Sequence, residues 1–400
     1  MNSSLPMDAI RHGAQEVGEQ AGRAAVEPAR ARPAIAILGT RGIPAQHGGF
    51  ETFAERLALY LAARDWDVTV YCQTAGSGRR HEAEWNGVRL VQIPEPRAGA
   101  RGTMVFDWKS TLDAARRDTL MLTLGYNTAA FCVWYRLRGR TNLINMDGLE
   151  WQRAKWRLPA KTWLYLNERL GCWLGNHLIA DHPEIAKHLE TRVSERKITT
   201  IPYGADAVLD ADEAMLERYS LEPRSYALVV ARPEPENSIL EIVSAFSARP
   251  RGKQLVVLGK YEPERNPYHA AVLQAASAEV LFPGAIYDQA VVAALRFFAQ
   301  LYVHGHTVGG TNPALVEALG AGCAVLAHDN RFNRWVAGSE NAYFASQAQC
   351  ETAFDALLED DLRLAIMRST SRQRHAARFA WDTVLAAYED LLLEYVPVAR

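Results

Sequence analysis

The sequence predicts an α/β protein made of two doubly wound domains that face each other across a cleft. Three observations support this fold class. The chain has 400 residues, a length that suits two domains of ordinary size better than one core. Short, wholly apolar segments alternate with helical ones, which is typical of parallel sheets covered by helices on both faces. This alternation restarts in the second half of the chain, so we expect one sheet in each domain.

The expected strands are short apolar segments, several of them separated by helical stretches. In the first half, Ala34–Leu38 leads into a glycine-rich turn and a helix from about Phe50. Such sheets bind ligands at the carboxyl ends of their strands, so we expect the site where the two sheets face each other. The other strand candidates of the first half are residues 68–72, 88–93, 120–124, 143–146 and 178–180. Those of the second half are residues 226–231, 255–258, 280–282, 301–303 and 324–327.

The domain boundary is expected near residues 201–206, ahead of an acidic helix at Asp210–Tyr219. The first 33 residues are rich in Ala, Arg, Glu and Gly, and we expect them to form a mostly disordered extension. A last helix at about Trp381–Tyr395 is amphipathic and long enough to cross back over the first domain. The predicted parts are an extension (1–33), a first domain (34–204), a second domain (205–380) and a returning C-terminal helix (381–400).

Composition excludes several classes of protein. Apolar residues make up 48% and charged residues 22% of the chain, as in soluble globular proteins, and the net charge of −2 gives no global attraction for nucleic acid. The five cysteines are dispersed without a C-x-x-C pair, which is typical of reduced thiols in a cytosolic protein. No apolar run is long enough to span a bilayer, and the N-terminus lacks the apolar core of a signal peptide. We therefore expect a cytoplasmic protein.

The most informative motif joins an apolar strand candidate to a small-residue helix in the second half. A glycine turn lies between them, and its free N–H groups and the helix dipole favour a phosphate. Glu317 on the helix is placed to touch that ligand, while His304 and His306 alternate at the strand end so that one can face the cleft. The turn residues expected to hold the phosphate are Gly309, Gly310, Thr311 and Asn312.

A second loop joins the first strand to the first helix. Gly48 and Gly49 would let the backbone approach a ligand where the helix begins with Phe50 and Glu51. Arg41 could clamp a phosphate. The G-x-G-x-x-G fingerprint of dinucleotide-binding proteins is absent from this loop. A long structural turn is the alternative interpretation.

Asp147 follows the strand candidate 143–146 and precedes a glycine, so the strand delivers its carboxylate to the edge of the cleft. A carboxylate in this place could act as the general base on an acceptor hydroxyl. The alternative role for Asp147 is to cap the next helix.

A further strand end carries Arg232, Glu234 and Glu236 ahead of a helix at Ile239–Phe246. Arg232 would neutralise a diphosphate, and Glu236 could bind a sugar or ribose hydroxyl. Alternatively, the glutamates are ordinary acidic residues of a first helical turn, where the macrodipole favours them.

Residues 151–173 mix tryptophans with basic residues, a composition suited to a membrane interface. Anionic lipid would attract the Lys and Arg side chains while the indole rings sit among the headgroups. The alternative is that the tryptophans pack into a core. The run comprises Trp151, Arg153, Lys155, Trp156, Arg157, Lys161, Trp163, Tyr165, Arg169 and Trp173.

Taken together, these motifs resemble those of the GT-B-fold, nucleotide-sugar-dependent glycosyltransferase family 4. Within that family they are most similar to bacterial rhamnosyltransferases of surface-polysaccharide assembly. The resemblance extends from about residue 34 to the C-terminus. It rests on G-T-R-G-I-P at 39–44, G-G-F-E-T at 48–52, D-G-L-E-W at 147–151, P-E-N at 235–237, H-G-H at 304–306 and G-G-T-N-P at 309–313.

The resemblance implies a GT-B fold whose C-terminal domain binds a nucleotide-diphospho-sugar and whose N-terminal domain binds the acceptor. It assigns Arg232 and the turn 309–312 to the donor diphosphate, Glu317 to the ribose and Asp147 to the catalytic centre of a retaining transfer. Neither a metal nor another cofactor is expected, because protein donors take the cation's role. The remaining residues expected at the donor are Glu236, Asn237 and His304.

The sequence departs from the broad family at three of these positions. Gly309 stands where the earlier of two glutamates is usual, Asn237 where a lysine is usual, and Thr307 where the rhamnosyltransferase-like branch often has Glu. Contacts to the diphosphate should therefore depend more on backbone N–H groups and on Arg232.

The predicted function is transfer of L-rhamnose from dTDP-rhamnose to a polyprenyl-diphosphate-linked or other glycan acceptor in bacterial polysaccharide biosynthesis. The protein would work in the cytoplasm, in peripheral contact with the inner membrane leaflet. Alternatives are a family 4 transferase that uses UDP-glucose, UDP-GlcNAc or GDP-mannose, a GT-B nucleotide-sugar epimerase, and a non-catalytic scaffold.

Overall fold

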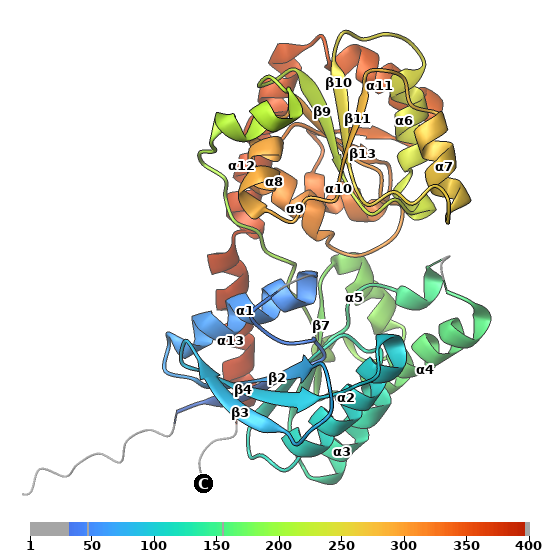
Figure 1. Cartoon of the computed structure of the whole chain (residues 1–400). Helices are drawn as coiled ribbons and strands as arrows, with labels where there is room; N and C mark the ends of the chain where they lie inside the picture. Colours follow the sequence, from blue (N-terminus) through green and yellow to red (C-terminus); the bar gives the residue numbers. More distant parts are fainter. Residues whose placement is uncertain (1–31, 46–47, 154–155, 397–400) are drawn as a thin grey trace, which may run out of the picture. The chain divides into compact units, whose positions relative to one another are not determined.

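The computed structural model describes residues 32–45, 48–153 and 156–396, so the extension predicted for residues 1–33 lies almost wholly outside the description. The described residues form two α/β halves, each built around its own sheet (Figure 1). This is the fold class that the sequence predicts.

The first sheet has eight strands in the order β3-β4-β2-β1-β5-β6-β7-β8. All neighbours pair in parallel except β3 and β4, which form an antiparallel hairpin at one edge. The central strands are apolar because helices cover both faces of the sheet. The strands are β1 (Ala34–Leu38), β2 (Asp67–Thr74), β3 (His81–Trp85), β4 (Val88–Pro94), β5 (Leu120–Leu124), β6 (Asn142–Asn145), β7 (His177–Ala180) and β8 (Ile198–Thr200).

The second sheet has six parallel strands in the order β11-β10-β9-β12-β13-β14. Its strands are also buried between two layers of helices. They are β9 (Tyr226–Val230), β10 (Gln254–Leu258), β11 (Val280–Gly284), β12 (Leu301–His304), β13 (Val325–His328) and β14 (Ala342–Phe344).

On the first sheet, α1 (Gly49–Ala62) and α13 (Trp381–Tyr395) cover one face, and α2, α4 and α5 cover the other. On the second sheet, α8, α9 and α10 cover one face, and α6, α7, α11 and α12 cover the other. The remaining helices are α2 (Gly99–Ala114), α3 (Val133–Leu137), α4 (Leu158–Leu174), α5 (Pro183–Glu190), α6 (Ile239–Ser247), α7 (Pro267–Gln274), α8 (Gln289–Phe298), α9 (Pro313–Gly320), α10 (Arg331–Ala337), α11 (Gln347–Leu357) and α12 (Asp361–Arg378).

Helix α13 belongs to the core of the first sheet although it follows the second sheet in the chain. Its Trp381, Leu385 and Tyr388 are buried among side chains of α1 and the first strands. The Asn145 side-chain amide at the end of β6 donates a hydrogen bond to the Tyr388 hydroxyl at 2.8 Å. The last helix is therefore bonded to the end of β6, the strand that precedes Asp147.

The segment predicted as an acidic helix at Asp210–Tyr219 differs from the prediction. It is a 3₁₀ helix, and it begins only at Glu213. The Asp212 carboxylate accepts a hydrogen bond from the Ala214 N–H at 3.0 Å, so this aspartate caps the helix instead of lying inside it.

Candidate active site

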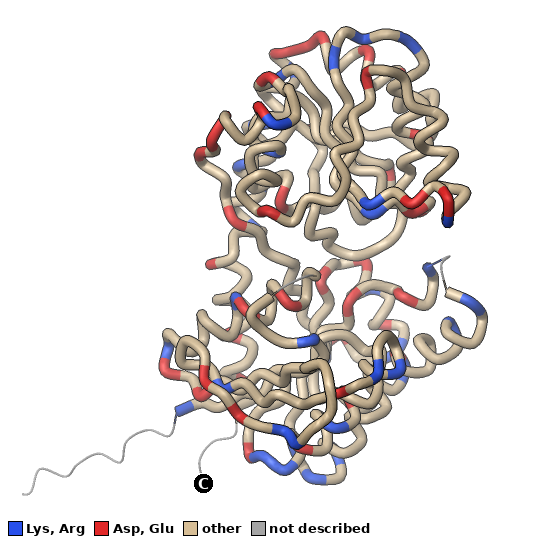
Figure 2. The backbone as a smooth tube through the Cα atoms, in the orientation of Figure 1, with Lys and Arg blue, Asp and Glu red and all other residues tan. Residues whose placement is uncertain are grey.

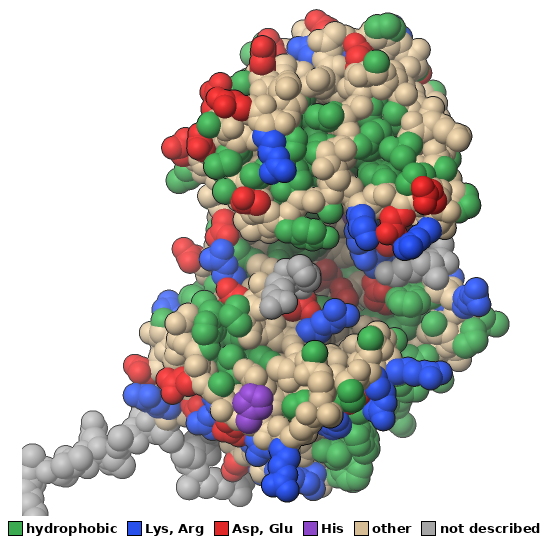
Figure 3. All heavy atoms as spheres, viewed as in Figure 1, with side chains coloured by type: hydrophobic (Ala, Val, Ile, Leu, Met, Phe, Trp, Pro, Cys, Tyr) green, Lys and Arg blue, Asp and Glu red, His purple; other side chains and the backbone are tan. Residues whose placement is uncertain are grey.

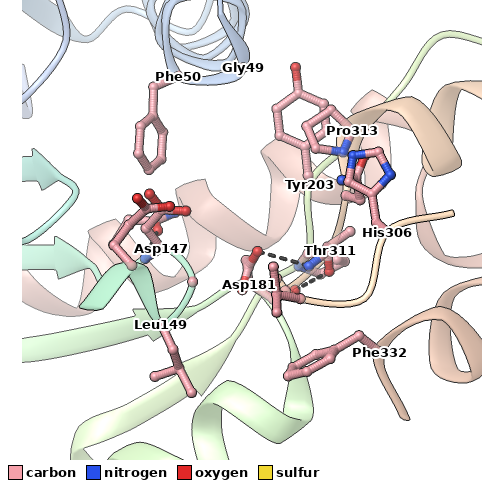
Figure 4. A pocket seen from close by; sticks show the side chains of 18 of the residues that line it. Gly49, Phe50, Asp147, Leu149, Asp181, Tyr203, His306, Thr311, Pro313 and Phe332 are labelled. Carbon is pink, nitrogen blue, oxygen red and sulfur yellow. Dashed lines mark hydrogen bonds between the residues drawn. The ribbon is translucent and has the colours of Figure 1, made fainter. Parts of the chain in front are cut away.

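The carboxyl ends of strands from both sheets meet at a cavity of about 430 Å³. Loops that follow β6 and β7 line it on one side, and the loop that follows β12 lines it on the other (Figure 4). The loop that follows β9 also contributes to the lining. Figure 3 shows that the surface is hollowed where the two halves face each other. Charged residues from both halves lie along the bordering loops (Figure 2). The cavity is therefore where the general rule for parallel sheets places a ligand site.

Asp147 lies in this cavity, two residues after the end of β6. Its backbone is left-handed, with φ of 52°, and its N–H donates to the Asn145 side chain at 3.0 Å. The buried Tyr126 hydroxyl fixes the rest of the loop: it donates to the Gly148 carbonyl at 3.0 Å and accepts from the Glu150 N–H at 2.8 Å. Leu149, not Asp147, is the N-cap of the next 3₁₀ helix (Glu150–Gln152). The capping alternative is therefore not what the loop adopts.

Asp181 is a second carboxylate in the cavity, and the sequence reasoning missed it. It follows β7 as Asp147 follows the neighbouring β6, so the same strand-end signal could have identified it. Its Oδ2 accepts a hydrogen bond from the Thr311 N–H at 2.9 Å, and the Thr311 hydroxyl donates to its backbone carbonyl. Its Oδ1 is buried and has no hydrogen-bond partner among the described residues. Burial, with the nearby charge of Asp147, raises the pKa of Asp181 to about 7.

The glycine turn after β12 forms the opposite wall of the cavity. Gly309 has a φ of 136°, and Gly310 lies so close to Asp181 that an added Cβ would come within 2.3 Å of its Oδ1. The Asn312 side chain caps α9 by accepting from the Ala314 N–H at 3.0 Å. All four predicted turn residues, 309–312, line this cavity.

The N-termini of α1 and α9 meet beside the turn. Gly49, the first residue of α1, lies against Pro313, the first residue of α9: a Cβ added to Gly49 would sit 3.3 Å from the proline ring. Phe50 and Gly49 line the cavity together with the turn. The positive ends of two helix dipoles, one from each half, therefore point to this region and favour an anion in it.

Arg232 and Glu236, which follow β9, both line the cavity. The Arg232 side chain is 67% exposed, with its nearest acidic partner, Glu234, at 3.7 Å. Glu236 is almost buried and accepts hydrogen bonds from Arg153 of the first half, one of them from Nε at 2.8 Å. Arg153 was predicted as part of the basic and aromatic run, and its place in the cavity was missed.

A second cavity of about 1090 Å³ lies at the carboxyl ends of β9, β10 and β11. Glu317 lines it, and its carboxylate is 2.5 Å from the guanidinium of the buried Arg296. Lys260 also lines it and pairs with Glu262 at 2.9 Å. The two cavities have common walls, formed by Arg232, Glu236, His306, Asn312 and Pro313. A ligand with two charged or polar ends could thus extend from the first cavity into the second.

Five of the predicted residues, Asn237 among them, do not line either cavity. His304 is only 1% exposed and lies under His306, with the two rings stacked at 4.3 Å. Arg41, Gly48 and Glu51 stay outside the lining, and the Arg41 N–H donates to the Glu51 carboxylate at 3.4 Å. Residues 46–47 of the same loop lie outside the described residues.

Asn237 was predicted to contact the donor, but its side chain has a structural role. Its side chain is buried and donates a hydrogen bond to the Arg232 carbonyl at 2.8 Å. The amide therefore shapes the loop that carries Arg232, and it does not reach into the cavity. His306, in contrast, lines both cavities, and burial with the neighbouring charges of Arg232 and Arg153 lowers its pKa to about 3.

The basic and aromatic run divides into a packed part and an exposed stripe. Trp151 packs edge-on against Tyr165 and donates to the buried Glu168. The exposed part lies along α4, which begins at Leu158 and has Pro159 in its first turn. The large apolar side chains exposed in this region are Trp156, Leu158, Trp163, Leu166 and Trp173.

Within the described ranges, no group of three or more His, Cys, Asp or Glu side chains is arranged to hold a metal ion. In the same part of the chain, no helix is long and apolar enough to cross a bilayer.

A family profile described as a domain of unknown function (DUF1972) matches residues 33–206. No curated protein sequence matches the chain. Similar solved structures include sucrose-phosphate synthase from Thermosynechococcus elongatus, with a TM-score of 0.76, 20% identity, and coverage of 91% of this chain and 99% of that one. Anabaena HepE in complex with UDP and glucose has a TM-score of 0.71 and 14% identity, and covers 91% and 100%.

Trehalose 6-phosphate synthase from Burkholderia multivorans is also similar, with a TM-score of 0.69, 10% identity, and coverage of 91% and 96%. Each of these structures matches over nearly its whole length and over nearly all of this chain. The protein therefore has the GT-B fold, as predicted. The narrower resemblance to family 4 and to rhamnosyltransferases stays a prediction.

Proposed function

We propose that the protein is a retaining glycosyltransferase that moves a sugar from a nucleotide-diphospho-sugar to an acceptor hydroxyl. One observation supports this most: Asp147, the glycine turn Gly309–Asn312 at the N-terminus of α9, and Arg232 line one cavity. The fold agrees with this activity, since HepE, one of the similar structures, is known in complex with UDP-glucose.

The donor would bind mainly to the second half. Its diphosphate fits beside the glycine turn, where backbone N–H groups, the N-terminus of α9 and Arg232 supply positive potential. The nucleoside fits the larger cavity at the ends of β9, β10 and β11. There Glu317, oriented by Arg296, would accept hydrogen bonds from the ribose hydroxyls.

The acceptor would enter from the first half, beside Asp147 and Phe50. As the bond from the sugar to the diphosphate breaks, negative charge grows on the leaving phosphate, and Arg232 and the turn N–H groups would stabilise it. Asp147 would orient the acceptor hydroxyl or take its proton as the new glycosidic bond forms on an oxocarbenium-like sugar. Closure of the two halves would exclude water and limit hydrolysis of the donor.

For the donor we propose dTDP-rhamnose, on the strength of the motif resemblance. UDP-glucose, UDP-GlcNAc and GDP-mannose are the competing donors. Asn237 and Gly309 are both uncharged, so neither would bind the donor sugar through a charge. The choice between donors would therefore depend on the shape of the cavity and on Glu236.

For the acceptor we propose a lipid-diphosphate glycan presented at the inner membrane leaflet. Leu158, Leu166 and Trp173 repeat at helical spacing and form one exposed apolar stripe along α4. Arg157, Lys161 and Arg169 belong to the same helix or its N-cap and would attract anionic lipid. Flotation with anionic liposomes should be lost in a Leu158→Ser/Trp173→Ser variant, and binding that is unchanged would contradict docking through this stripe.

The decisive experiment is mass spectrometry of the products formed from a panel of nucleotide-sugars, with and without a lipid-diphosphate acceptor. A glycosylated acceptor from dTDP-rhamnose is the expected result. Asp147→Asn should abolish transfer while donor binding is largely kept, because the amide cannot take a proton. A changed nucleotide-sugar without acceptor would indicate an epimerase, and neither transfer nor hydrolysis of any donor would indicate a scaffold.

A further inference from the structure

The donor cavity contains an electrostatic conflict. A nucleotide-sugar brings two negative charges to the glycine turn, yet Asp147 and Asp181 already line the same cavity. Asp181 is the closer of the two to the turn, because Thr311 donates to it from both its N–H and its hydroxyl (Figure 4). An ionised Asp181 would repel the diphosphate it must accommodate.

Few cations are present to offset this repulsion. Arg232 reaches the cavity but is largely exposed. Arg153 also lines it, yet it is engaged by Glu236 and by Glu150 at 2.8 Å. Asn237, the last residue of the 3₁₀ helix Pro235–Asn237, adds no cation, because its side chain is a buried amide that donates to the Arg232 carbonyl. A neutral side chain that donates a hydrogen bond would therefore favour diphosphate binding in this cavity, whereas another anion would oppose it.

We propose that Asp181 binds the donor diphosphate as a neutral carboxylic acid, so that donor binding is coupled to the uptake of one proton from solvent. The inference rests on the proposed function and adds a residue and a proton to it. In this arrangement Oδ2 keeps the hydrogen bond from the Thr311 N–H. Oδ1, which is buried and lacks a partner in the described structure, carries the proton and donates it in a hydrogen bond to a phosphate oxygen. No covalent bond of the donor changes.

The surroundings favour the neutral form of Asp181. Burial is the main cause that raises its pKa to about 7, and the charge of Asp147 adds to it. The hydrogen bond from Thr311 acts in the opposite direction, but it is the smaller effect. A diphosphate next to Oδ1 would raise the pKa further, since it adds negative charge. Donor binding therefore favours protonation of Asp181, and protonation of Asp181 strengthens donor binding.

Other titratable groups near Asp181 do not account for such a linkage around pH 7. Burial lowers the pKa of His182 to about 4, and that of His306 lies at about 3. Burial raises the pKa of Tyr388 and of Tyr203 far above neutrality. The charged groups that line the same cavity are Asp147, Glu150, Arg153, Arg232 and Glu236.

The test is calorimetric titration of the full-length protein with nucleotide-sugars, dTDP-rhamnose and UDP-glucose, between pH 5.5 and 8.5. These ligands do not titrate in that range, and comparing buffers of different ionisation enthalpy gives the number of protons taken up. We expect uptake near zero at the acidic end and close to one proton on the alkaline side. The dissociation constant should be flat below pH about 6 and rise by up to about tenfold per pH unit above pH about 7.

Asp181→Asn is the sharpest variant, because its amide has the shape of the protonated acid and can donate from the same position. It should bind the donor as tightly as the wild type does at low pH, with no proton uptake at any pH. Asp147→Asn should shift the wild-type pH profile to lower pH, since it removes the charge that raises the pKa of Asp181. Glu359→Gln, an exposed residue between α11 and α12, is the control for loss of a distant carboxylate.

Two results would overturn the inference. One is donor binding by the wild type without proton uptake across the whole range, a measurement that does not depend on any variant. The other is an Asp181→Asn protein that is folded by thermal melting but still shows the wild-type pH dependence. If none of the nucleotide-sugars binds at any pH, the proposed function fails instead, so the two failures are distinguishable.

Discussion

At the scale of single residues, burial acts on carboxylates inside and outside the site. Asp107 on α2 is 8% exposed, and its carboxylate accepts a hydrogen bond from the Thr128 hydroxyl at 2.9 Å. It lines neither described cavity, yet burial raises its pKa to about 6. Burial thus disfavours the ionised form of both carboxylates. Only Asp181 lies where a bound ligand could form a hydrogen bond with the neutral form.

Asp107→Asn should stabilise the protein at neutral pH. The folded protein holds the Asp107 proton more tightly than the unfolded chain does, so this group favours folding below pH about 4 and that contribution is lost as the pH rises through about 6. The loss amounts to roughly 3 kcal/mol at pH 8. Thermal melts should therefore show a higher Tm for the variant at pH 8 and almost no difference at pH 4. Asp118→Asn, at an exposed position, is the control, and an equal gain in both variants would contradict the argument.

At the scale of elements, the glycine turn is shaped by its contact with Asp181, the residue that follows β7. Gly310 has no room for a side chain, because a Cβ would meet both oxygens of Asp181 within 2.4 Å. Gly309 has nothing within 4 Å of its added Cβ, but its φ of 136° is one that side chains rarely adopt. The two glycines are thus required for different reasons, one for space and the other for backbone conformation.

Gly310→Ala should weaken donor binding by about tenfold, since the turn must move and lose the hydrogen bond from the Thr311 N–H to Asp181. Calorimetry with a nucleotide-sugar measures the loss. Gly78→Ala is the control, because its added methyl would make an ordinary contact with Pro94 at 3.7 Å. Donor affinity that is the same in Gly310→Ala and the wild type would show that the turn does not hold the donor.

Most strands could be predicted because they are apolar and follow one another at regular intervals. The structure adds β3, β8 and β14, which the sequence reasoning missed. The strand β3 is charged, but Asn86 and Gly87 after it have φ values of 48° and 79°, as in a two-residue hairpin turn, and Asn-Gly is a recognisable signal for one. The strands β8 and β14 have three residues each, which is too few to show a pattern.

The site was predictable only where it depends on local sequence. Asp147, Arg232 and the turn 309–312 each follow an apolar strand, and the structure brings them to one cavity. Arg153 had no such signal, because its partner Glu236 is 83 residues away in the chain. Burial of Asn237 and His304 likewise results from tertiary packing that no local pattern reports.

At the scale of the whole folded unit, the contacts that join the two halves around the cavity include three between residues of its lining. Asp181 bonds to Thr311, Gly49 lies against Pro313, and Arg153 pairs with Glu236. Each contact joins a loop at the carboxyl ends of one sheet to a loop or helix start of the other. We expect opening of the cavity to break these contacts, so that they oppose the entry of donor and acceptor.

The pair between Arg153 and Glu236 is the strongest of these contacts by charge, because both side chains are mostly buried. Arg153→Met should therefore leave Glu236 uncompensated and cost on the order of 1–3 kcal/mol, measured as coupling in a double-mutant cycle with Glu236→Gln. A less stable closed state admits water, so the ratio of donor hydrolysis to transfer should rise in the variant. Arg157→Met, an exposed position outside both cavities, is the control with a water-soluble acceptor. A coupling near zero with an unchanged ratio would mean that this ion pair does not hold the two halves together during transfer.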